Sequence, residues 1–140
     1  MELPSWGDFY KTYKNDPEKC QTKAFELGKT VGHELMSKLN LDGNDLDTLA
    51  NIVNAFMSEV KAETTAKGEG NKVVYRNRSF CPIIISARSF NQPWLWLDEN
   101  AAWPMMEGLA SAVNPNVKHK VPAARANGDL VCQHVWELTK

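Results

Sequence analysis

The hydrophobic residues of this chain change their spacing near Gly70, and that change limits the possible folds more than any other feature. Before Gly70 they recur every three or four residues, which is the period of an amphipathic helix. After Gly70 they tend to alternate, as in a strand with one buried face. A chain of 140 residues has room for one domain. We therefore predict a single α+β domain over 1–140, with two long antiparallel N-terminal helices packed on a small, mostly antiparallel sheet with a third helix.

The first periodic segment predicts a long helix over Pro17–Asn40, with Asp16 as its N-cap and Pro17 in its first turn. Gly28 and Gly32 lie one turn apart beside the apolar stripe, and each costs about 1 kcal/mol of helix propensity. We therefore expect another backbone to approach them closely, although a merely weak helix explains them nearly as well. The stripe contains Cys20, Ala24, Leu27, Val31, Leu35 and Leu39.

A second helix is predicted from about Asn44, its cap, to Thr64, which completes a helical pair over 17–66. The short Asp42–Gly43 turn makes the two helices antiparallel. The N-terminal arm, residues 1–16, is predicted to be a short helix clamped on the body or on a neighbouring copy, and the second arrangement would make a homo-oligomer. Its aromatic residues are Trp6, Phe9, Tyr10 and Tyr13.

The sheet-containing half, 71–140, follows a connector at Lys67–Asn71 that we expect to be flexible. Phe80–Ile85 is a dense apolar run that contains Pro82. It predicts either a buried strand that the proline restricts to a start or an edge, or a short buried turn. The other predicted elements are a strand over Lys72–Arg78, a helix over Pro104–Val113, a strand over Val117–Val121, a loop over Pro122–Asp129 and a strand over Leu130–Leu138.

Composition and charge exclude several classes of protein. The chain has 16 basic and 17 acidic residues, and no basic excess of the kind that nucleic-acid-binding modules carry. No apolar stretch approaches the roughly 20 residues that span a bilayer. Met1–Pro4 is acidic and polar, so we expect no secretory signal there. Cys20, Cys81 and Cys132 are odd in number and widely spaced, which predicts free thiols in a reducing cytoplasm.

The terminal hairpin carries the first candidate site. Cys132 and His134 share one face of the last strand, and His119 of the preceding strand can lie opposite or diagonal to them. Adding Cys81 gives two thiolates and two imidazoles, a set that can bind zinc tetrahedrally. The spacing has no Cys-x-x-Cys or His-x3-His pair, however, and a face of this kind more often simply packs. We therefore predict no resident cofactor or metal, with zinc on these four residues as the alternative.

Nucleophilic catalysis is the second candidate, with Cys81 or Cys132 as the nucleophile and a histidine as the base. His134 lies roughly 7 Å along the strand from Cys132, too far for a direct hydrogen bond. The cross-strand His119 is better placed. The opposing interpretation is an inert core thiol, which is the commoner fate of a cysteine.

The third candidate is an apolar cavity. Aromatic and thioether side chains gather between Trp94 and Met106, and such residues line ligand pockets and partner interfaces but also fill cores. The predicted ligand-binding residues are Trp94, Trp96, Trp103, Met105, Met106 and Trp136.

The C-terminal half also resembles a known group of proteins. It contains Cys81-Pro82, then Asn114-Pro115, then Gly128-Asp129 followed by Val131-Cys132. This order resembles the small-molecule-binding superfamily of the 4-vinyl reductase domain and the L-2-amino-thiazoline-4-carboxylic acid hydrolase-like proteins. The resemblance implies an α+β fold, an apolar cavity between helices and sheet, and late cysteines that bind metal or take part in chemistry. The stretch Ala101–Pro104 lacks a further cysteine that such proteins often have, so the fold and the cavity carry over most directly.

Two functions follow from these residues. The first is a cytoplasmic small-molecule-binding domain with an apolar, tryptophan-lined cavity, which would be a hydrolase if Cys81 or Cys132 acts with His134. The alternative is a non-catalytic accessory or regulatory subunit that docks on a larger enzyme through its aromatic segments. The expected partner is accordingly a small organic ligand or a larger protein subunit, with no nucleic acid and no membrane span.

Overall fold

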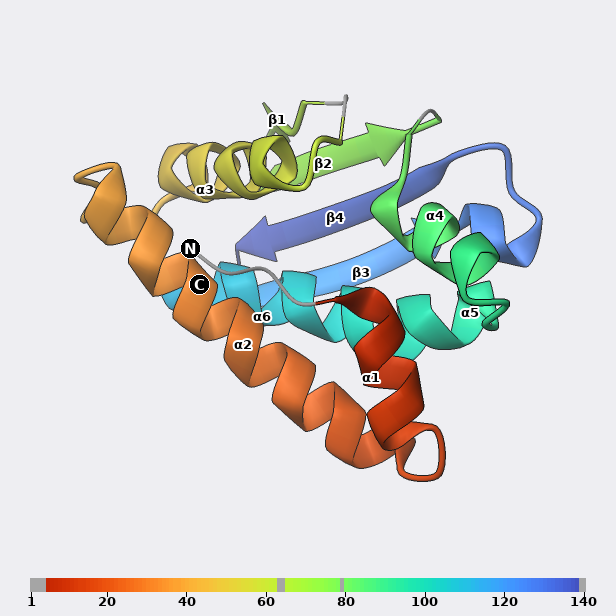
Figure 1. The fold of residues 1–140 in the computed structure, drawn as a ribbon. Helices are drawn as coiled ribbons and strands as arrows, with labels where there is room; N and C mark the ends of the chain where they lie inside the picture. The colour runs from red at the N-terminus through yellow and green to blue at the C-terminus, as the bar shows by residue number, and fades with distance from the viewer. Residues whose placement is uncertain (1–4, 63–64, 79, 139–140) are drawn as a thin grey trace.

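The computed structural model describes residues 5–62, 65–78 and 80–138, so the expectation for Met1–Pro4 lies outside the described residues. Helices and strands are mixed along the chain (Figure 1), which confirms the α+β class. Among the described helices, none combines the length and apolar content needed to cross a bilayer. The elements are α1 (Trp6–Tyr13), α2 (Pro17–Lys38), α3 (Leu46–Glu59), β1 (Lys67–Glu69), β2 (Lys72–Asn77), α4 (Pro82–Ser89), α5 (Trp94–Leu97), the π-helical η1 (Asp98–Ala102), α6 (Trp103–Val113), β3 (Val117–Ala123), the 3₁₀ turn η2 (Arg125–Asn127) and β4 (Cys132–Leu138).

In the described part of the chain, four strands form an antiparallel sheet in the order β1-β2-β4-β3. Tyr75 of β2 pairs with His134 of β4, while His119 of β3 pairs with Trp136. The helices gather on one face of this sheet (Figure 1). The connector prediction was wrong for Lys67–Glu69, which pairs with β2 as a short edge strand whose three residues are all exposed.

Helix α2 begins at Pro17, as the spacing of its hydrophobic residues and the Asp16 cap predict. The Asp16 side chain accepts a hydrogen bond from the backbone N–H of Lys19 and so caps the helix. The predicted close approach at Gly28 is confirmed. A Cβ atom there would lie 2.0 Å from the carbonyl oxygen of Met105 on α6, and one at Gly108 would lie 1.9 Å from that of Phe25. The glycines therefore let the backbones of α2 and α6 come into direct contact.

Helix α3 ends earlier and begins slightly later than its hydrophobic pattern predicts. Its N-cap is Asp45 rather than Asn44, since the Asp45 carboxylate accepts a hydrogen bond from the backbone N–H of Thr48. The helix packs on β1, β2 and α6, whereas α2 packs mainly on α6.

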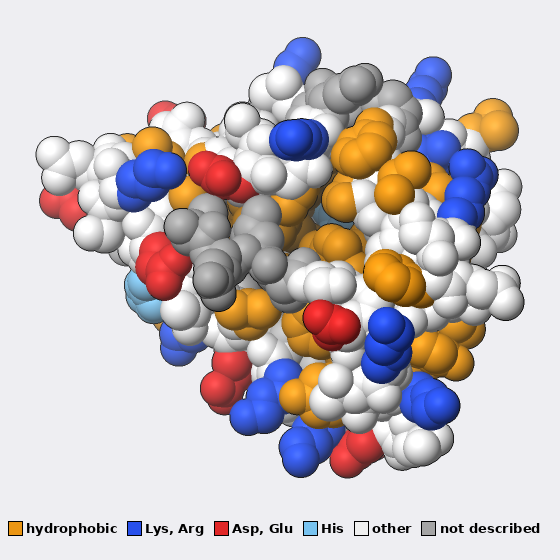
Figure 2. Space-filling model, viewed as in Figure 1, with side chains coloured by type: hydrophobic (Ala, Val, Ile, Leu, Met, Phe, Trp, Pro, Cys, Tyr) orange, Lys and Arg blue, Asp and Glu red, His pale blue; other side chains and the backbone are white. Residues whose placement is uncertain are grey.

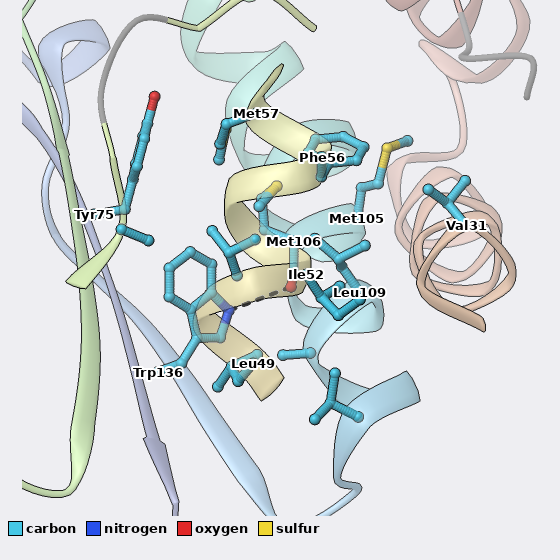
Figure 3. Close-up of a cluster of buried hydrophobic side chains, with 14 of the residues drawn as sticks. Val31, Leu49, Ile52, Phe56, Met57, Tyr75, Met105, Met106, Leu109 and Trp136 are labelled. Atoms are coloured by element: carbon cyan, nitrogen blue, oxygen red, sulfur yellow. Dashed lines mark hydrogen bonds between the residues drawn. The ribbon is translucent and has the colours of Figure 1, made fainter. Parts of the chain in front are cut away.

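The main core lies between the sheet and these helices (Figure 3). Tyr75 and Trp136 reach from the sheet toward α3 and α6, and Val31 lies beyond them on α2. Trp136 is fully buried, and its indole N–H donates a hydrogen bond of 3.3 Å to the Met106 carbonyl.

The apolar run at Phe80–Ile85 is neither the strand nor the turn that the sequence suggests. It begins helix α4, with Cys81 at the N-cap and Pro82 in the first turn, where a proline is tolerated. Ile83, Ile84 and Ala87 are buried while Ile85 is exposed, which is the spacing of a half-buried helix. The predicted third helix is also longer, because α5 and η1 precede α6 without a break from Trp94.

The ends of the chain also differ in detail from the sequence pattern. β4 begins at Cys132, two residues later than predicted, and Leu130 lies in the preceding loop with 91% of its surface exposed. At the other end, helix α1 packs on the body of its own chain, with Phe9 buried in the main core.

Candidate functional site

A cavity of about 70 Å³ lies between the sheet and the helices. Figure 2 shows it as a hollow on the face that carries α3 and α4, with hydrophobic side chains around it and a histidine at its base. Its wall is mostly apolar, with a few polar groups from β2, β4, α4 and η1. The lining residues are Trp6, Phe56, Met57, Val60, Ala62, Tyr75, Asn77, Cys81, Pro82, Ile83, Asp98, Ala102, Trp103, Met106, Cys132 and His134.

The cavity brings together several residues that the sequence singles out from separate elements. Cys81 comes from the start of α4, and Cys132 and His134 come from β4. Trp103 and Met106 come from α6. The three candidate catalytic residues and two of the candidate ligand-binding residues therefore share one site.

The other predicted ligand-binding residues lie elsewhere. Trp94 and Trp96 pack on a second buried cluster around Ile83 and Leu97. Met105 and Trp136 are fully buried in the main core. These side chains support the walls of the cavity without lining it.

The two histidines of the hairpin form a hydrogen-bonded pair. Nε2 of His119 lies 2.9 Å from Nδ1 of His134, and the two rings are nearly parallel. Burial lowers the pKa of His134 to about 4, and burial together with His134 lowers the pKa of His119 well below its usual value. Both rings are therefore neutral near pH 7, and Nδ1 of His134 is already occupied by its neighbour.

Neither thiol in the cavity is activated. Burial raises the pKa of Cys81 to about 11, although the backbone N–H groups of Ile83 and Ile84 act in the opposite direction. Burial also raises the pKa of Cys132, whose sulfur accepts a hydrogen bond of 3.3 Å from the backbone N–H of Arg125. A nucleophilic cysteine needs the thiolate, so these two thiols are poorly suited to attack a substrate near neutral pH.

Asp98 is the site residue that was hardest to predict from sequence patterns. It lies at the start of η1, is only 5% exposed and lines the cavity. Burial, with a smaller effect from Glu99, raises the pKa of its carboxyl to about 7. Its buried position depends on the continuous helical path from α5 into η1, which no local sequence motif predicts. Trp6, Phe56, Met57 and Tyr75 likewise carry no signal that separates a cavity wall from ordinary core.

The zinc alternative does not assemble in this structure. Across residues 5–62, 65–78 and 80–138, no three histidine, cysteine or acidic side chains are placed to hold a metal ion together. His119 lies outside the cavity, beside Pro104 and Lys120 on a separate surface hollow. The three cysteines Cys20, Cys81 and Cys132 are all unpaired.

The fold of the chain resembles that of a protein of known structure. No protein-family model matches the chain, and no curated protein matches it. Among the solved structures that match is a trafficking protein particle complex subunit 3 from Naegleria fowleri, covalently bound to palmitic acid. The TM-score is 0.56 and the sequence identity 12%, over 95% of this chain and 87% of that chain. The two proteins therefore share a fold across nearly their full lengths.

Proposed function

We propose that this chain is a non-catalytic subunit of a larger protein assembly and that it holds an apolar ligand in its cavity. The observation that carries the proposal is an apolar cavity that contains two thiols and a histidine, none of them activated. Small-molecule sites are typically concave and apolar with a few placed polar groups. The wall has that composition, whereas hydrolysis needs an activated nucleophile and a base.

The fold likeness supports both parts of the proposal. The protein with the similar structure is a subunit of a complex, and it carries palmitic acid. An apolar ligand larger than the present cavity would displace side chains from its wall. Met57 and Met106 line the cavity and, as unbranched thioethers, can change rotamer at little cost. An apolar ligand cavity is also what the resemblance to the 4-vinyl reductase group implies, and unpaired cysteines fit a cytoplasmic location.

The surface around α4 is the docking face in this proposal, in place of the aromatic segments that the sequence suggests. Phe80, Ile85 and Phe90 are 40–49% exposed there. Arg78 and Arg88 are exposed beside them, and the chain contains no acidic residue from Gly70 to Leu97. The partner is therefore a protein surface with apolar side chains bordered by carboxylates.

The test compares two aspartate substitutions at similarly exposed apolar residues. Ile85→Asp lies on α4 and is 48% exposed in the wild type, while Leu39→Asp lies at the end of α2 and is 44% exposed. Each tagged protein is isolated without denaturation from the cells in which the chain is native, and the mass of the complex is measured. We expect the wild type and Leu39→Asp to form a complex of fixed stoichiometry with a second protein, and Ile85→Asp to lose it.

Two results would contradict this account. A wild-type protein that runs as the 15.7 kDa chain alone, or only as copies of itself, would show that it is not a subunit of a mixed assembly. A complex that survives Ile85→Asp as well as it survives Leu39→Asp would show that the α4 face is not the docking surface.

A further inference from the structure

The Asp98 carboxyl is buried, and among the described residues it has no charge partner. Within residues 5–62, 65–78 and 80–138, no hydrogen bond or ion pair involves its side chain, and no lysine or arginine lines the cavity. Carboxylates are almost never fully buried unless they are paired or hydrogen-bonded. Asp98 is only 5% exposed, yet it lines the cavity. A group that enters the cavity can therefore contact its carboxyl.

We infer that the cavity binds apolar molecules that carry a protonated amine, and that Asp98 is the group that recognises the amine. This inference rests on the proposed function, because it assigns a head group to the apolar ligand. An ammonium group supplies both the positive charge and the hydrogen-bond donors that the Asp98 carboxylate lacks. The alkyl part of the ligand would lie against the apolar wall formed by residues such as Phe56 and Met106.

The other polar groups of the cavity do not supply the missing charge. Cys81 and Cys132 are close enough for the charge of Asp98 to raise their pKa values, and both are neutral thiols near pH 7. His134 is neutral as well, since burial lowers its pKa to about 4. A fatty acid would place a second carboxylate beside Asp98, and like charges at close range are unfavourable. An alcohol is tolerated but gains no charge interaction.

If Asp98 recognises an amine, the affinity of the cavity for that amine should depend on pH. The titratable groups that line the cavity with Asp98 are Cys81 at the N-cap of α4, Tyr75 from β2, and Cys132 and His134 from β4, and Glu99 is next to it in the chain. Asp98 has a pKa of about 7, so its ionised fraction rises between pH 6 and pH 8 while an alkylamine stays protonated. If only the ionised form pairs with the amine, the affinity for the amine increases about tenfold over this interval. The affinity for an alcohol should stay nearly constant.

The test measures binding of octylamine, 1-octanol and octanoate to the full chain by titration calorimetry. At pH 8 we expect the wild type to bind octylamine about tenfold more tightly than 1-octanol, and octanoate most weakly. Asp98→Asn should bind octylamine and 1-octanol nearly equally. Glu99→Gln is the matched control, because it removes the neighbouring exposed carboxylate, and it should keep the preference.

Each possible outcome decides the inference. Equal binding of the amine and the alcohol by the wild type, or a preference that survives Asp98→Asn, overturns the role of Asp98 while leaving an apolar ligand cavity in place. Binding of none of the three probes contradicts the ligand cavity as well. If Asp98→Asn does not fold, the wild type still decides the matter. Its affinity for octylamine must rise between pH 6 and pH 8 while its affinity for 1-octanol does not.

Discussion

At the scale of single residues, Asp98 and His134 line the same cavity and their pKa values are shifted in opposite directions. The carboxyl has a pKa of about 7 in the folded chain and about 3.9 when unfolded. The imidazole has a pKa of about 4 in the folded chain and about 6.5 when unfolded. Asp98 therefore destabilises the fold increasingly as the pH rises from 4 to 7, and His134 does so as the pH falls from 6.5 to 4. The two contributions oppose each other over the same interval.

The first prediction uses Asp98→Asn to separate the pH-dependent contribution of Asp98 to stability from that of His134. Since asparagine cannot ionise, the variant should gain stability relative to the wild type as the pH rises, by about 2–4 kcal/mol between pH 4.5 and pH 7.5. Urea unfolding of both proteins at the two pH values measures this difference. A difference in the free energy of unfolding that is the same at both pH values would contradict the raised pKa that burial gives Asp98.

A second prediction concerns the reactivity of Cys81. Because burial raises its pKa to about 11, its thiolate is scarce at pH 8 in the folded chain. Iodoacetamide should therefore modify Cys81 about 100-fold more slowly in the native protein than in the denatured protein, where the thiol has its ordinary pKa. Peptide mass spectrometry over time gives both rates. Comparable rates in the two states would show that the Cys81 thiol is reactive in the folded chain, and would contradict its low thiolate fraction.

At the scale of elements, helices and strands in which hydrophobic residues recur regularly over many positions could be predicted. Short elements without such a pattern could not. α2 and β2 form close to their expected bounds because many residues share one pattern. α4 could not be predicted because its isoleucines favour strands, whereas packing and the first-turn Pro82 place them in a helix. β1 is three exposed residues that pair on one side only, so its sequence carries no burial pattern.

The contact between α2 and α6 gives a third prediction. Gly28→Ala places a Cβ atom 2.0 Å from the Met105 carbonyl, so the two helices must separate. We expect a loss of at least about 2 kcal/mol in the free energy of unfolding, despite the better helix propensity of alanine. Gly68→Ala is the control, because its new Cβ would lie 4.0 Å from the nearest atom, and it should change stability by less than about 0.5 kcal/mol. Denaturant unfolding that ranks the two variants equally would contradict the close packing.

At the scale of the whole molecule, the candidate site was only partly predictable. Alternation along β4 places Cys132 and His134 on one face, and that much follows from the sequence alone. Their meeting with Cys81, Trp6 and Asp98 depends on how α4, α1 and η1 pack on the sheet, which no local pattern encodes. The structure has an apolar cavity between helices and sheet, but most of the residues that line it could not be predicted from the sequence.

Native mass spectrometry shows whether the cavity holds an apolar ligand. The protein is isolated from its native cells, alongside Ala102→Leu, which fills the cavity from a residue that lines it. We expect the wild type to carry an additional small apolar molecule, and Ala102→Leu, folded as judged by its melting curve, to carry none. A wild type without any bound molecule, or one whose ligand persists in folded Ala102→Leu, would contradict it.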